Sequence, residues 1–203
     1  MGDLAGAEAS FRAAIAADPG YANAHFNLGN ALAARGELQG ALAAYRAAVA
    51  ADSGHAKAQY NLGVMHANGE GGLAVDHAKA LGWYRKAAAQ DHAAAQYNLG
   101  AMHQHGRGGL AVDEAKALGW FRKAAAQGVH AARRMLARMH ERGEGGLAED
   151  PAEGARLRGL VREAADAGDA KARAALEAFA AFEATLKDDD DEDDEPPPAA
   201  KTC

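Results

Sequence analysis

A long segment of this chain occurs twice in almost the same form. The stretch that begins HAKAQYNLG at His55 returns as HAAAQYNLG at His92, so the offset between the two copies is 37 residues. A more divergent third copy starts at Ala131, and a related stretch with a shorter period of 34 residues starts at Ala22. Repetition at a fixed period is typical of chains that stack one supersecondary unit on the next. The sequence therefore predicts a repeat array rather than one globular core.

Each copy predicts two helices joined by a glycine-rich loop. The chain contains 57 alanines in 203 residues, which strongly favours helix over strand. Large residues recur at helical spacing in the first half of a copy, and Ala80, Tyr84 and Ala87 do so in the second half. The glycines of residues 69–72 suit the left-handed end of the first helix. Because one hairpin cannot bury its apolar face alone, we expect neighbouring hairpins to cover it.

A glycine inside the first helix of each copy predicts a close approach between helices. Gly63 recurs as Gly100, in the middle of an otherwise regular helical pattern. Glycine at such a position costs about 1 kcal/mol relative to alanine. We expect it to be present because a neighbouring helix leaves no room for a Cβ atom.

These patterns resemble two related families. In residues 2–52, Leu28-Gly29, Gly36, Ala41 and Tyr45 match the tetratricopeptide repeat. The later runs Leu-Gly-x-x-His-x-x-Gly-x-Gly-Gly and Lys-Ala-x-Gly-Trp-Tyr/Phe-Arg-Lys-Ala-Ala resemble Sel1-like repeats. This resemblance implies an all-α, right-handed α-solenoid of stacked helix-turn-helix hairpins, and a scaffold for protein–protein interaction.

We divide the chain into four parts. Residues 1–54 are expected to be tetratricopeptide-type repeats, the first without its first helix, and residues 55–168 three Sel1-like repeats. Residues 169–187 are expected to form a capping helix. Residues 188–203 contain eight consecutive acids and three prolines, and are expected to be a disordered tail.

No catalytic, cofactor or metal site is expected. The chain lacks a Gly-x-Ser-x-Gly elbow and a Gly-Lys-Ser/Thr phosphate loop, and its one cysteine is the last residue. His66, His103 and His140 recur every 37 residues, but equivalent residues on adjacent repeats lie too far apart to share one zinc ion. We expect these three histidines to fill a core position. With no signal peptide or membrane span visible, we expect a cytoplasmic location, with the nucleus as the alternative.

Two sets of first-helix residues are candidates for binding a protein partner. Asparagine offers both a donor and an acceptor, which suits the backbone of an extended peptide, and aromatic rings add apolar contact. The same side chains could instead join neighbouring hairpins. The candidates are Asn27, Asn61 and Asn98, together with Phe26, Tyr60 and Tyr97.

Charged residues near the C-terminal end suggest a second mode of binding. Arg134 and Arg138 are part of a stripe on one helix that could hold an acidic partner, hold the chain's own tail, or be a solvated face. The acidic run 188–195 could instead bind basic, histone-type proteins in the manner of a chaperone. We expect protein partners, and neither nucleic acid nor membrane.

Overall fold

The computed structural model describes residues 4–178 and 180, and this part of the chain is helical with no β-strand. A single helix, α1 (Leu4–Ala17), is followed by four helical hairpins. The hairpins are α2 (Ala22–Ala34) with α3 (Leu38–Ala51), α4 (Ala56–Asn68) with α5 (His77–Ala88), α6 (Ala93–His105) with α7 (Glu114–Ala126), and α8 (His130–Arg142) with α9 (Pro151–Asp166). Residues 170–178 form a further helix.

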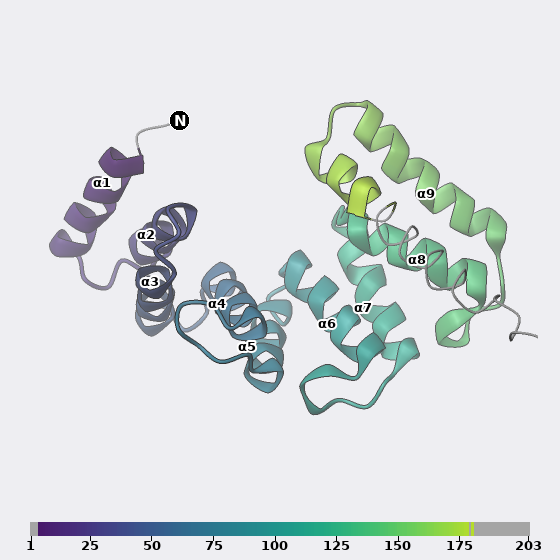
Figure 1. Cartoon of the computed structure of the whole chain (residues 1–203), viewed down its shortest axis with the longest axis horizontal. Coiled ribbons are helices and arrows are strands. Elements are labelled where there is room, and N and C mark those ends of the chain that lie inside the picture. The colour runs from purple at the N-terminus through teal and green to yellow at the C-terminus, as the bar shows by residue number, and fades with distance from the viewer. Residues whose placement is uncertain (1–3, 179, 181–203) are drawn as a thin grey trace, which may run out of the picture.

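The hairpins follow one another along a curved row, so the predicted α-solenoid is confirmed. Figure 1 shows α2, α4 and α6 on the inner side of the curve and α3, α5 and α7 on the outer side. The first helices of successive hairpins therefore form one continuous face. No helix in the described part of the chain is both long and apolar enough to cross a membrane.

Short signals in the sequence set where these helices begin and end. Asp76 and Asp113 are the N-caps of α5 and α7, and each side chain accepts a hydrogen bond from a backbone N–H three residues later, at 2.9 and 2.8 Å. Gly69 and Gly106 end α4 and α6 in the left-handed conformation, with φ of 71° and 63°. The glycine-rich loops therefore terminate the first helices as predicted.

The glycines inside the first helices face aromatic rings of the second helices. A Cβ atom on Gly63 would lie 2.6 Å from Cε1 of Tyr84, and one on Gly100 would lie 2.6 Å from Cε1 of Phe121. Gly29 has the same relation to Tyr45 at 2.5 Å. The predicted close approach is therefore confirmed, and its partner is the ring of the same hairpin.

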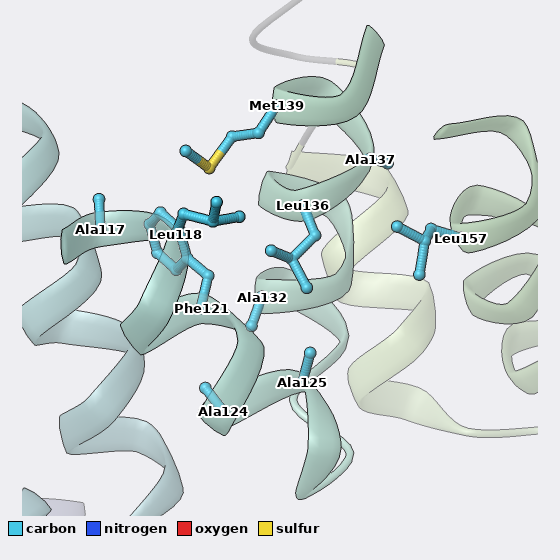
Figure 2. Packing of buried hydrophobic residues seen from close by; sticks show 10 residues of the cluster. All are labelled: Ala117, Leu118, Phe121, Ala124, Ala125, Ala132, Leu136, Ala137, Met139 and Leu157. Atoms are coloured by element: carbon cyan, nitrogen blue, oxygen red, sulfur yellow. The ribbon is translucent and has the colours of Figure 1, made fainter. Parts of the chain in front are cut away.

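The last hairpin keeps this close approach but moves the glycine to the other helix. Ala137 stands in α8 where the earlier hairpins have glycine, and Gly154 stands in α9 where they have Ala80 and Ala117. A Cβ atom on Gly154 would lie 2.9 Å from the carbonyl oxygen of Ala137. The core of this region joins α7, α8 and α9 through ten residues (Figure 2): Ala117, Leu118, Phe121, Ala124, Ala125, Ala132, Leu136, Ala137, Met139 and Leu157.

The helix of residues 170–178 covers the end of the array. Asp169 caps it by accepting hydrogen bonds from the N–H groups of Lys171 and Ala172. Ala172 and Ala175 are buried against Val161 and Ala165 of α9. The rest of the predicted capping helix and the acidic tail 188–203 lie outside the described residues.

Candidate functional site: a groove along the first helices

Three pockets open in sequence along the face formed by the first helices. The first pocket lies between α2 and α4 and has a volume of about 130 Å³; the central pocket lies between α4 and α6 and has about 340 Å³. The third pocket lies between α6 and α8, beside residues 170–178, and has about 320 Å³. We call the three together the groove. The first pocket is lined by residues that include Tyr45, Asn61, Val64 and Glu70. The lining of the central pocket includes Tyr60, Asn68, His77, Tyr84, Asn98, Ala101 and Arg107. The lining of the third pocket includes Tyr97, His105, Arg134, Met135 and Arg138.

The pockets are equivalent because the repeat brings the same positions to each of them. Asn61 of the first pocket and Asn98 of the central pocket are 37 residues apart, as are Glu70 and Arg107. The position of Ala101 in the central pocket is taken by Arg138 in the third. The fold therefore repeats the shape of the groove while the sequence varies its chemistry.

Two of the three candidate asparagines join successive hairpins. Asn61 donates to Oδ1 of Asn30 at 3.2 Å, and that same oxygen accepts from the hydroxyl of Tyr45 at 2.9 Å. The amide of Asn98 lies beside the hydroxyls of Tyr60 and Tyr84 in the preceding hairpin, close enough to lower the pKa of both. Burial raises the pKa of Tyr84 to about 12, and the polar contact with Asn98 opposes that rise. Asn61 and Asn98 thus stabilise the array even before any partner binds.

Asn27 differs because no hydroxyl stands opposite it. The residue of α1 that corresponds to Tyr45 is Phe11, and the Asn27 side chain forms no hydrogen bond with the residues described. Asn61 and Asn98, by contrast, both contact the preceding hairpin, so they belong to the interface between hairpins as well as to the face of the first helices.

The candidate aromatic residues are half-buried between hairpins. The ring of Phe26 lies 4.9 Å from that of His55, and the ring of Tyr60 lies 4.8 Å from that of His92. Tyr97 packs on Phe121 with 5.7 Å between ring centroids. Each ring therefore packs within the array, although Tyr60 and Tyr97 also line pockets.

Sequence patterns alone did not identify two sets of side chains that hold the helices in place. His55 and His92 cap α4 and α6, because Nδ1 of each accepts from a backbone N–H at 3.2 and 3.4 Å. Buried Gln59 and Gln96 accept hydrogen bonds from Gln90 and Gln127 at 2.9 and 2.8 Å, which joins each first helix to the turn that follows the second helix of its hairpin. All of these residues recur at the 37-residue period, and this recurrence is the sequence signal that could have identified them.

Comparison with known families agrees with this geometry. Sel1 repeat models match residues 56–92, 93–129 and 130–157, about half of the chain, and a tetratricopeptide repeat model matches residues 1–56. The chain belongs to the Sel1 repeat family. Its N-terminal part is a tetratricopeptide-like repeat, and no curated protein matched the chain.

Solved structures of Sel1 repeat proteins resemble the chain over most of its length. A protective antigen of uropathogenic Escherichia coli with an SLR fold is 31% identical, with 81% of this chain and 34% of that protein covered and a TM-score of 0.66. A Sel1 repeat protein from Oxalobacter formigenes is 31% identical, and the match covers 76% of this chain and 62% of that protein with a TM-score of 0.60. The chain thus spans about a third of the first protein and less than two thirds of the second. A protein named MamA shares the fold at 22% identity, and the match covers 88% of this chain and 92% of that protein with a TM-score of 0.53.

The arginine stripe of the third Sel1 repeat is largely engaged with the chain itself. Arg134 is only 7% exposed and donates to the carbonyl oxygen of Ala175 in the terminal helix. Arg138 and Arg142 each lie 3.8 Å from the carboxylate of Glu144. Arg134 is therefore not part of a solvated face, and Arg138 lines the third pocket beside an acid.

The repeated histidines of the Sel1 repeats differ in burial. His66 and His103 are buried, as predicted, and burial lowers the pKa of both imidazoles. The prediction is wrong for His140, which is only half-buried. Its surroundings differ, because Glu153 stands in α9 where α5 and α7 have Lys79 and Lys116. Within the described residues, no three His, Cys, Asp or Glu side chains come together as a metal site would require.

Proposed function

We propose that this chain is a non-enzymatic scaffold that binds an extended peptide or a partner helix along the groove. Proteins built from Sel1 and tetratricopeptide repeats generally mediate protein–protein interactions and are typically non-catalytic. The observation that carries the proposal is the row of three equivalent pockets between successive first helices. A ligand with regularly spaced side chains could place one in each pocket.

The composition of the pockets supports a polypeptide ligand. Tyr60 and Tyr84 provide aromatic walls in the central pocket, and the amides of Asn68 and Asn98 add polar groups at its lining. Apolar walls with a few placed polar groups are the usual composition of binding pockets.

The proposal is tested by filling the central pocket. Ala101→Gln places a long neutral side chain there, and the array accommodates such length because the equivalent residue is Arg138. The control is Ala126→Gln, at an exposed position of the outer helix α7. A library of random dodecapeptides is selected on the full-length protein, and the affinity of a selected peptide is measured by fluorescence polarisation.

We expect Ala101→Gln to weaken binding at least about tenfold, equivalent to about 1.4 kcal/mol, while Ala126→Gln leaves it unchanged. If no library peptide binds the wild-type chain, or if the selected peptides bind both variants equally, the groove is not the binding surface.

A further inference from the structure

The loop of each of the three Sel1 hairpins has a charged residue at one repeat position beside the groove, and the sign of this charge changes along the array. The residues are Glu70, Arg107 and Glu144, each 37 positions from the next. Glu70 lines the first pocket, Arg107 lines the central pocket, and Glu144 lies next to Arg138 of the third pocket. The central pocket is therefore the one in which this position is a cation.

The two acids are matched by side chains within the described part of the chain, whereas the cation has no ion-pair partner there. Asn68 donates to Oε1 of Glu70 at 2.8 Å, and Glu144 is 3.8 Å from both Arg138 and Arg142. Arg107 forms no ion pair with a residue of the described chain, and no carboxylate lines the central pocket. Arg107 is exposed and is thus open to a carboxylate that enters the pocket.

The backbone holds this arginine in place at the pocket. Arg107 begins the short 3-10 helix η1 (Arg107–Gly109), directly after the left-handed cap Gly106. Gly108 has φ of 71°, and a Cβ atom on it would lie 2.6 Å from the carbonyl oxygen of His77 at the start of α5. Because η1 packs this closely on the preceding hairpin, the arginine starts from a fixed position at the rim.

We propose that the central pocket binds the carboxylate of an aspartate or glutamate in the groove-bound peptide, with Arg107 as its cationic partner. This inference rests on the proposed function, because it assigns one side chain of the peptide that the groove would hold. A guanidinium binds a carboxylate through two parallel hydrogen bonds. Asn98 also lines this pocket, as does Asn68, whose amide donates one N–H to Glu70 and has a second.

The electrostatic field around Arg107 is positive. Partial desolvation lowers the pKa of neighbouring His105, and the positive charges of Arg107 and Arg138 lower it further. A carboxylate carries one charge, which one free arginine matches. A phosphate group carries nearly two and is usually held by a cluster of cations. We therefore assign a carboxylate rather than a phosphorylated residue.

The first arm of the test reads the sequences of the selected dodecapeptides. We expect Asp or Glu to be enriched at one aligned position. Replacing that residue with Asn or Gln should weaken binding to the full-length protein roughly tenfold. Replacement by phosphoserine should not improve binding over glutamate. Selected peptides without an enriched acid, or tighter binding of the phosphoserine peptide, would overturn the assignment.

The second arm reverses the charge of the pocket. Arg107→Glu should weaken the acidic peptide at least roughly tenfold, and a peptide with Lys at the same position should regain affinity for this variant. The control is Arg122→Glu, which makes the same charge change at an exposed position of α7 that lines none of the three pockets. Circular dichroism confirms that both variants are folded.

The variants separate failure of this inference from failure of the proposed function. If Ala101→Gln abolishes binding while Arg107→Glu behaves like Arg122→Glu, the groove binds peptides but does not read an acid through Arg107. If the peptide binds all of these variants with wild-type affinity, the groove itself is not the binding surface.

Discussion

At the scale of single residues, the helices pack closely because a missing Cβ faces a ring. The ring of Phe121 is fully buried, and its edge occupies the space where a side chain on Gly100 would begin. Close-packed interiors tolerate an added methyl group poorly, because the surrounding atoms have no void to move into. The glycine thus lowers the intrinsic helix propensity of α6, but it allows α6 and α7 to pack closely.

Gly100→Ala should therefore destabilise the protein by about 1–3 kcal/mol, through overpacking against Phe121. Gly119→Ala is the matched control, since Gly119 lies in the middle of α7 and a methyl group there would meet no neighbouring side chain or helix within 4 Å. That change should stabilise by about 0.5–1 kcal/mol, because alanine is the better helix former. Urea unfolding measures both. Equal stability of the two variants would contradict the close-approach argument.

At the scale of the helical element, neighbouring hairpins are joined by polar contacts as well as by apolar packing. Asn98 of α6 reaches the hydroxyls of Tyr60 and Tyr84 in the preceding hairpin, whereas Asn27 of α2 faces a helix that has Phe11 at the equivalent position. The same residue type at the same repeat position therefore has a different energetic role. The difference is that the helix on the N-terminal side of Asn27 has no hydroxyl group at this position, because Phe11 stands there.

Asn98→Ala should lower the free energy of unfolding by about 1–2 kcal/mol, because the hydroxyls of buried Tyr84 and half-buried Tyr60 lose a neighbouring polar group. Asn27→Ala should change it by less than about 0.5 kcal/mol. Thermal unfolding followed by circular dichroism compares them. The interface role of Asn98 is refuted if both substitutions have the same small effect.

At the scale of the whole molecule, each hairpin is stabilised mainly by its immediate neighbours. The same titratable group therefore recurs along the array, and small contributions from several repeats add. Burial lowers the pKa of His66, His92 and His103, so the folded chain keeps these imidazoles neutral at a pH where the unfolded chain protonates them. Protonated His92 would also lose its capping bond to the N–H of Ala95.

The free energy of unfolding should accordingly fall as the pH drops from 7.5 to 5.5, because free histidine titrates near about 6.5 and the unfolded state takes up protons first. Carboxylate effects lie outside this window: the pKa of Asp76 and Asp113 is lowered by hydrogen bonds from Lys79 and Lys116, so their contribution is lost only below about pH 4. Urea midpoints at pH 7.5, 6.5 and 5.5 measure the change.

His92→Asn provides the control for this pH dependence, because asparagine caps a helix without titrating in this range. We expect the variant to lose less stability than the wild type between pH 7.5 and 5.5. A wild-type midpoint that is the same at both ends of the range would show that the histidines are not held neutral by the fold.

The groove shows where prediction from sequence stopped. The repeat located the first-helix face and identified Asn61, Asn98, Tyr60 and Tyr97, because equivalent positions of a solenoid must lie on one face. It did not show that Asn98 lies beside tyrosine hydroxyls of another hairpin, or that Arg134 is covered by residues 170–178. Those contacts depend on how neighbouring units dock, and periodicity within a unit does not specify it.

By itself, the sequence determined the secondary structure, the hairpin and the stacking of hairpins. Alanine content, apolar spacing and glycine position are local properties, and each acts within one repeat. Only the tertiary structure decided which side chains of neighbouring hairpins line a pocket together with each loop residue. Glu70, Arg107 and Glu144 occupy the same repeat position; Glu70 and Glu144 are matched by side chains of their own hairpins, whereas Arg107 lies at a pocket lined by α4, α5 and α6. Electrostatic pairing depends on distance in space, and that distance exists only after the chain has folded.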